Sequence, residues 1–132
     1  MHAYLVDTNI LVELIRAKDG RRELLESLLL AGGDLACSAI ALAELHAGMR
    51  PHERDRTEAL LNEFRHLDVT PPIARLGGSL KAEWAARGFK LTLSDAMIAA
   101  TAITHNLVLV TTSPKDFPMP EDRLYPRVNA SR

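Results

Sequence analysis

The sequence contains a single cysteine, Cys37, and no apolar run long enough to cross a membrane. One cysteine excludes an intrachain disulfide framework and fits a reducing compartment. A spanning helix needs about 20 apolar residues, and the N-terminal apolar run meets Asp7 before a signal-like stretch forms. We therefore expect a cytoplasmic protein without membrane contact, in which Cys37 is a small buried side chain.

An excess of positive charge is also missing. The 16 Lys and Arg residues face 17 Asp and Glu residues, which gives a net charge of −1. Such a chain has no global basic field, so any RNA-binding surface must be local. Two groups of cations are candidates for it: Arg16, Lys18, Arg21 and Arg22 in one stretch, and Arg87 and Lys90 in another. The alternative is that each group is a solvated face.

Signatures of several enzyme classes are absent. The chain has no Walker glycine–lysine loop, no dinucleotide fingerprint and no G-x-S-x-G elbow. His46 and His52 have no Cys or His partner at zinc-ligand spacing. Asp7-Thr8-Asn9 lacks the second aspartate that phosphatases with an aspartyl nucleophile carry two residues after the first. Nucleotide-loop, serine-hydrolase and zinc chemistry are therefore disfavoured.

Length and composition indicate one domain over residues 1–132. With 132 residues, 47% hydrophobic and 25% charged, the chain can bury a single core. Short apolar strands alternate with helices, which predicts an α/β sandwich with a mostly parallel central sheet. Prolines concentrate in residues 114–132, so we expect a loop-rich C-terminal tail there. The expected strands are 3–7, 34–37, 67–70 and 107–110, and the expected helices begin near 8 and span 21–31, 39–48, 51–66, 71–88 and 93–105.

Three acids stand where the pattern predicts apolar surroundings. Asp7 ends a strand that should be buried, Glu44 has only apolar or small neighbours on its helix face, and Asp95 lies on a helix with almost no polar side. A bare buried carboxylate costs several kcal/mol, so each must be protonated, paired with a cation, or coordinate a metal. Pairing with Lys or Arg is one alternative, but the expected elements offer no interior cation. For Asp95 a second alternative is helix capping, with Thr92 as N-cap.

The predicted positions of two of these acids, Asp7 and Asp95, agree with a role in metal coordination. Ligands of α/β sheets gather at strand carboxyl ends and adjacent helix N-termini, the places predicted for Asp7 and Asp95. Oxygen-only ligands suit Mg²⁺ or Mn²⁺. After the last core strand, Thr111-Thr112-Ser113 and Asp116 can orient water or phosphate, or can simply form a turn.

Four segments together resemble the PIN-domain family. They are Asp7-Thr8-Asn9-Ile10-Leu11, the Ser38 to Gly48 stretch with Glu44-Leu45, Leu93-Ser94-Asp95 with Ile98-Ala99-Ala100, and Val110-Thr111 with Asp116-Phe117. Within the family, the sequence is most similar to the VapC toxins of bacterial and archaeal toxin–antitoxin pairs. The resemblance covers essentially the whole chain and implies a PIN-like α/β/α sandwich.

The resemblance also implies an activity and partners. The activity is that of a Mg²⁺- or Mn²⁺-dependent endoribonuclease. The implied partners are a second copy of the chain in a homodimer and a cognate VapB-like antitoxin that blocks the activity. By the family pattern, Asp7, Glu44 and Asp95 would be the core acids and metal ligands. The fourth acidic position departs from the pattern, because many relatives have Asp or Asn where this chain has Ser113. Asp116 is then the nearby acid that can complete the catalytic set.

A metal held by the three core acids would activate water and stabilise charge at phosphorus. Thr8 or Ser113 would be the supporting residues that orient that water. No histidine is placed to act as a metal-free acid–base pair, so cleavage should require the cation. Two alternatives remain: a catalytically silent PIN-like module that binds RNA or peptide, and a metal-dependent phosphatase for small molecules.

Overall fold

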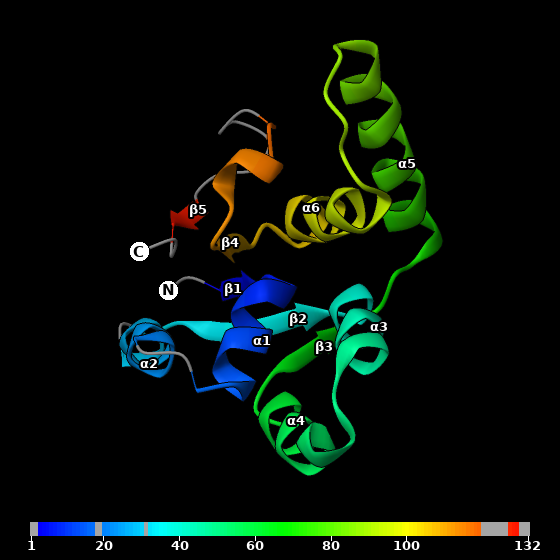
Figure 1. Ribbon diagram of the computed structural model, residues 1–132. Coiled ribbons are helices and arrows are strands. Elements are labelled where there is room, and N and C mark those ends of the chain that lie inside the picture. Colours follow the sequence, from blue (N-terminus) through cyan, green and yellow to red (C-terminus); the bar gives the residue numbers. More distant parts are fainter. Residues whose placement is uncertain (1–2, 18–19, 31, 120–126, 130–132) are drawn as a thin grey trace.

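The computed structural model describes residues 3–17, 20–30, 32–119 and 127–129. Its sheet has the strand order β3-β2-β1-β4-β5, and every neighbouring pair is parallel. Helices cover both faces of this sheet (Figure 1), so the predicted α/β/α sandwich is confirmed. The strands are β1 Ala3–Val6, β2 Asp34–Ser38, β3 Arg65–Leu67, β4 Val108–Thr111 and β5 Arg127–Asn129. The helices are α1 Thr8–Ile15, α2 Arg21–Leu30, α3 Ala39–Gly48, α4 Arg54–Leu61, α5 Pro71–Ala86 and α6 Leu93–His105, with short 3-10 turns η1 Pro51–Glu53 and η2 Pro114–Asp116.

Alternation along the central strands creates two apolar cores. On β1, Tyr4 and Val6 point to one face while Leu5 points to the other. The first face is covered by α1, α2, α3 and α4, and the second by α5 and α6. Both faces of the central strands are therefore buried, which explains their almost continuous apolar sequence.

Helices α5 and α6 approach each other closely through Gly77. This glycine is buried in α5, and a Cβ atom placed on it would lie 2.6 Å from Sδ of Met97 in α6. The contact holds α6 against the sheet, where Ile98 and Ala99 are almost fully buried. None of the described helices is both long and apolar enough to cross a membrane.

Three expectations are corrected here. The helix predicted over 51–66 is a 3-10 turn followed by α4, which ends at Leu61, and β3 starts at Arg65 rather than Leu67. The tail predicted as loop contains η2 and, at Arg127–Asn129, a strand that pairs with β4; residues 120–126 and 130–132 of that tail lie outside the described part.

Candidate active site

Asp7 lies immediately beyond the carboxyl end of β1, at the centre of the sheet. Its backbone N–H donates to the Val110 carbonyl at 2.9 Å, so the pairing of β1 with β4 continues through Asp7. The side chain is the N-cap of α1 and its Oδ1 accepts the Thr8 N–H at 2.8 Å. Asp7 is 5% exposed. Burial raises its pKa above the ordinary value, against the lowering effect of its hydrogen bonds.

Thr111 at the end of β4 holds the second oxygen of Asp7. Its hydroxyl donates to Oδ2 of Asp7 at 2.9 Å, and the same hydroxyl oxygen accepts the Ser113 N–H at 3.0 Å. Thr111 is completely buried. The sequence pointed to the hydroxyls after the last core strand but named Ser113, not Thr111, as the supporting residue. The structure shows Ser113 acting through its backbone on Thr111.

Asp95 lies in the first turn of α6, as predicted. Thr92 is the N-cap, and its hydroxyl oxygen accepts the Asp95 N–H at 3.1 Å. Burial, followed by the nearby charge of Asp7, raises the pKa of Asp95 to about 6. The capping alternative is therefore confirmed for the backbone of Asp95. Its carboxyl group interacts with Thr92 as well and feels the charges of Asp7, Asp116 and Glu44.

Glu44 corrects the expectation of a buried carboxylate. Its side chain is exposed, because α3 buries only a narrow face and the apolar neighbours of Glu44 on that helix do not cover it. Its Oε1 accepts the Thr8 hydroxyl at 2.7 Å. Thr8 thus links the start of α1 to α3, and through its N–H and hydroxyl it contacts both Asp7 and Glu44.

Asp116, in the 3-10 turn η2, lies close enough to Asp7 and Asp95 for its charge to act on both. Its charge raises the pKa of both Asp7 and Asp95, as does the charge of Glu44. The 3-10 turn begins at Pro114, so the chain turns after Ser113 as the proline suggested. The four acids predicted from sequence are therefore electrostatic neighbours, although they come from four different elements of the chain.

The chemistry of these acids fits a hard divalent cation. No Lys or Arg within the described ranges forms an ion pair with any of the four. Burial, with a smaller contribution from the neighbouring acids, raises the pKa values of Asp7 and Asp95, and a bound cation would lower them. No three Asp, Glu, His or Cys side chains in the described part of the chain converge into a ready-made metal cage. Mg²⁺ keeps several waters and binds through one or two carboxylates, so two acids such as Asp7 and Asp95 could hold it.

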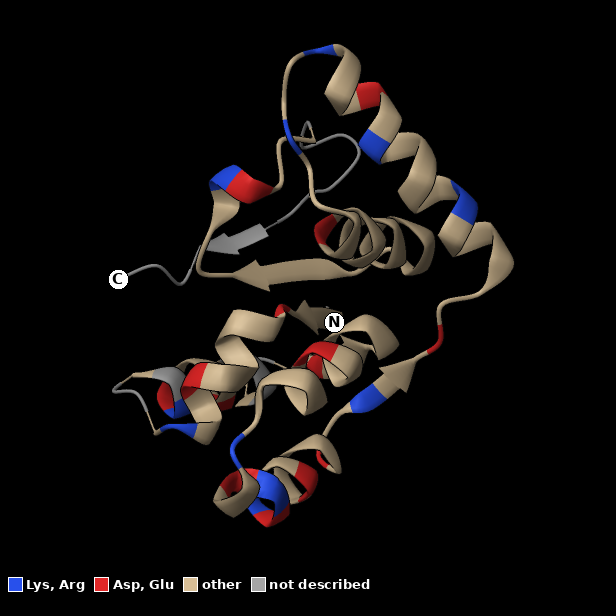
Figure 2. Cartoon of the chain, turned by 45° about the vertical axis from the view of Figure 1, so that its right-hand side comes forward, with Lys and Arg blue, Asp and Glu red and all other residues tan. Residues whose placement is uncertain are grey.

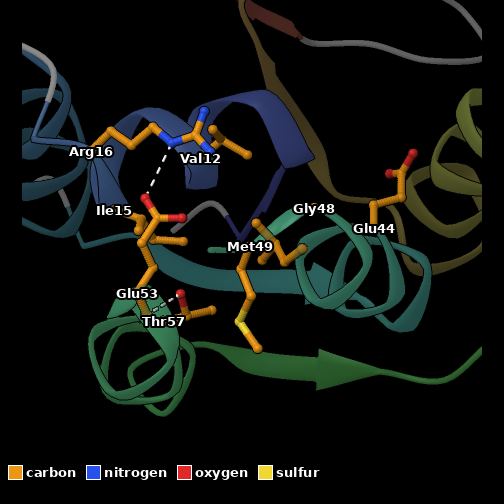
Figure 3. A pocket seen from close by; sticks show the side chains of 9 residues that line it. Val12, Ile15, Arg16, Glu44, Gly48, Met49, Glu53 and Thr57 are labelled. Atoms are coloured by element: carbon orange, nitrogen blue, oxygen red, sulfur yellow. Dashed lines mark hydrogen bonds and ion pairs between the residues drawn. The ribbon is translucent and has the colours of Figure 1, made fainter. Parts of the chain in front are cut away.

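A pocket of about 200 Å³ lies beside Glu44, between α1, α3 and η1 (Figure 3). Val12, Ile15 and Met49 give it apolar walls. At the end away from Glu44, Arg16 Nε donates to Glu53 Oε2 at 3.2 Å, and Glu53 is only 2% exposed. Arg16 is therefore held by an acid, rather than being an unpaired cation for RNA.

The remaining candidate cations fall on two sides of the sheet. Lys18 and the side chain of Arg21 lie outside the described residues, while Arg22 is exposed on α2. Arg87 and Lys90 are exposed at the end of α5 and in the loop to α6. Cys37 is buried, as expected.

The comparisons with known proteins agree with this fold. Residues 4–119 match the PIN domain family. The chain is similar to "Ribonuclease VapC10" of Mycobacterium tuberculosis, with 37% identity covering 87% of this chain and 86% of that protein. It is also similar to "Ribonuclease VapC19" of the same organism, with 36% identity covering 87% and 92%. A solved structure of VapBC2 from Rickettsia felis bound to a promoter DNA fragment superposes with a TM-score of 0.82 at 26% identity, covering 96% of this chain and 99% of that chain. With a family match over most of its length and relatives above 30% identity, this chain belongs to the PIN domain family.

Proposed function

We propose that the chain is a Mg²⁺- or Mn²⁺-dependent endoribonuclease and the toxin of a toxin–antitoxin pair. The proposal rests on Asp7, Glu44, Asp95 and Asp116, which are electrostatic neighbours near the carboxyl end of the central strand β1. None of them has a cationic partner among the described residues. A structural role would leave these acids paired, because unpaired charges in partly buried positions destabilise the fold. Relatives named as ribonucleases support RNA as the substrate.

The chain's own groups divide the work of holding a cation. Asp7 and Asp95 would be direct ligands, Glu44 would bind directly or through water, and Asp116 would support them. A cation there would supply Lewis-acid stabilisation of phosphodiester oxygens and lower the pKa of an attacking water. Thr111 fixes the orientation of Asp7, and Thr8 fixes that of Glu44. Ser113 supports Thr111 through its backbone.

The partners follow from the relatives rather than from the chain alone. Several solved neighbours are toxin–antitoxin complexes, among them one from Klebsiella pneumoniae at 36% identity. We therefore propose a cognate VapB-like antitoxin as the binding partner, homodimerisation of the toxin, and action in the cytoplasm.

The decisive experiment compares cleavage of single-stranded RNA with Mg²⁺, with Mn²⁺ and with EDTA. We expect cleavage with either cation, none in EDTA, and none by Asp7→Asn under any condition. Full activity in EDTA would contradict the metal role. RNA binding without cleavage by the wild type would favour the silent module, and turnover of a chromogenic phosphate ester without RNA cleavage would favour the phosphatase.

A further inference from the structure

The end of α5 carries a basic surface that the acid site does not use. Figure 1 shows α5 projecting beyond the sheet, with the following loop running from its tip to α6. In Figure 2, Lys and Arg positions recur along α5 and this loop. Between residues 81 and 92 the cations are Lys81, Arg87 and Lys90, and the one acid is Glu83. The segment is therefore locally positive on a chain whose net charge is −1.

A helix C-terminal motif fixes the shape of this surface. Gly88 has φ +83°, the left-handed conformation that suits glycine, and its N–H donates to the Ala85 carbonyl at 3.0 Å. The Phe89 N–H donates to the Trp84 carbonyl at 2.9 Å, which completes a Schellman motif. The rings of Trp84 and Phe89 meet edge to face with centroids 6.2 Å apart. Loop and helix are thus locked together, so the cations on them are preorganised.

The two exposed cations of the motif are available to a ligand. The Arg87 guanidinium lies 4.6 Å from the centre of the Trp84 ring, and its contact with Glu83 is a marginal 4.0 Å between two exposed side chains. Lys90 is exposed, with Phe89 half-buried beside it. Lys81 plays a different part, since its ammonium donates to the Leu91 carbonyl at 2.8 Å and anchors the loop.

A hollow of about 230 Å³ lies between these groups, lined by Lys81, Ala85, Gly88, Phe89 and Lys90. Surfaces that bind single-stranded nucleic acids combine cations, which contact the phosphates, with aromatic rings on which bases stack, and the half-buried ring of Phe89 lies beside cations here. Lys90 precedes Asp95 by five residues, so their Cα atoms lie at most about 18 Å apart. A single strand of several nucleotides is long enough to span this distance.

We propose that Arg87, Lys90 and Phe89 form a docking surface for the backbone and one base of single-stranded RNA, beside the acid site. The proposal rests on the proposed ribonuclease function and adds the place where the substrate strand is held outside the reacting phosphate. Because Arg87 and Lys90 are positively charged, the surface is complementary to a polyanion. The aromatic ring of Phe89 in the hollow favours an unpaired strand over a duplex, whose bases are stacked inside.

The test measures RNA binding rather than cleavage. A fluorescein-labelled single-stranded RNA of about ten nucleotides is titrated by anisotropy in EDTA between 50 and 200 mM salt, and its integrity is checked on a gel. The test variant is Arg87→Gln/Lys90→Gln. The matched control is Arg54→Gln/Arg56→Gln, which removes two exposed cations from α4 on the opposite face of the sheet.

We expect the test variant to bind more weakly at low salt and to lose about 1.4 from the slope of log K against log salt, since each single-strand phosphate contact contributes about 0.7. Phe89→Leu should weaken binding at least about fivefold without changing the slope. The control should match the wild type. Unchanged affinity and slope in the test variant, or equal losses in the control, would overturn the proposal.

The same experiment separates this surface from the activity. If the wild type cleaves RNA with Mg²⁺ but Arg87→Gln/Lys90→Gln keeps its salt slope, the docking surface is wrong and the nuclease stands. If the wild type neither binds nor cleaves RNA, the proposed function fails and the docking surface fails with it. Circular dichroism melting of each variant confirms that it is folded.

Discussion

The hydroxyl of Thr111 donates to Oδ2 of Asp7 across 2.9 Å, joining the ends of the two central strands inside the protein. Both residues are buried, so this bond decides which way the Asp7 carboxylate faces. It also lowers the pKa of Asp7 against the effect of burial. Removing the donor should therefore misorient the acid and favour its protonated form.

Thr111→Val tests this relationship with little change in shape. We expect metal affinity and RNA cleavage to fall by about 10–100-fold, as for other groups that orient metal ligands. Loss of a buried hydrogen bond should also cost about 1–3 kcal/mol of stability. Isothermal titration with Mn²⁺ and cleavage rates provide the measurement. Thr111→Ser should restore both, and Thr112→Val serves as the neighbouring control; equal effects of the two valine variants would contradict the orienting role.

Asp95 should make the metal-free protein less stable as pH rises. Its pKa is about 6 in the folded protein against an ordinary value of 3.8, so between these values the folded state binds more protons than the unfolded state. The free energy of unfolding then decreases with increasing pH across this window. In EDTA, Asp95→Asn should melt higher than the wild type at pH 7.5, with a smaller difference at pH 5.

Melting curves at the two pH values, with and without Mn²⁺, check this behaviour. The cation should stabilise the wild type at pH 7.5 and lose its effect below about pH 6, where protons compete for Asp95. An Asp95→Asn protein that is less stable by the same amount at both pH values would mean that the carboxylate serves only the helix dipole.

Glu44 should matter for activity but not for stability, because its side chain is exposed. Glu44→Gln should abolish metal-dependent cleavage while leaving the melting temperature in EDTA unchanged, in contrast to Asp7→Asn, which removes the cost of burying an ionised carboxylate. Glu58→Gln is a matched control, since Glu58 is an exposed acid that pairs with His46 on the neighbouring helix. Cleavage retained by Glu44→Gln would remove this residue from the site.

The fourth acidic position is tested by two substitutions in η2 and before it. Asp116→Asn should reduce metal affinity by about 10–100-fold without eliminating cleavage, as expected for a supporting group. Ser113→Asp should raise metal affinity by placing an acid at the family position. Mn²⁺ titrations of both variants decide between them. Unchanged affinity in Ser113→Asp together with complete loss in Asp116→Asn would make Asp116 a direct ligand.

Glu53 should contribute stability that is lost in acid. It accepts hydrogen bonds from the Arg50 N–H at 2.9 Å and from Arg16, and these bonds lower its pKa. Its stabilisation is therefore present above the ordinary pKa of 4.5 and disappears as pH falls through the lowered value. Glu53→Gln should lower the melting temperature at pH 7, with a smaller deficit near pH 3. An equal deficit at both values would assign the effect to packing alone.

The sequence predicted correctly the bounds of elements that begin and end at recognisable capping residues. Helix α6 has the expected bounds because Thr92 caps its start and Asn106 ends it in the left-handed conformation, with φ 54°. The helix expected over 51–66 failed for a definite reason. Phe64 is buried beside Leu61 in the same core, so their spacing continues a helical pattern through residues that form a turn.

Within the site, sequence reasoning found the acids but not their environments. Glu44 has apolar neighbours on its own helix, yet exposure depends on what packs against that helix, which sequence spacing does not reveal. The supporting role of Thr111 was not predicted for a related reason, since its hydrogen bond to Asp7 joins residues 104 positions apart. Only the adjacency of β1 and β4 places the two together.

The strand order has a consequence for the timing of synthesis. β1 is synthesised well before its partner β4, and Thr111 follows Asp7 by 104 residues in the chain. A nascent chain that does not yet contain β4 lacks a central strand and the Thr111 hydroxyl that orients Asp7. During synthesis, the acid site therefore cannot be completed until the segment that contains β4 and η2 has been made.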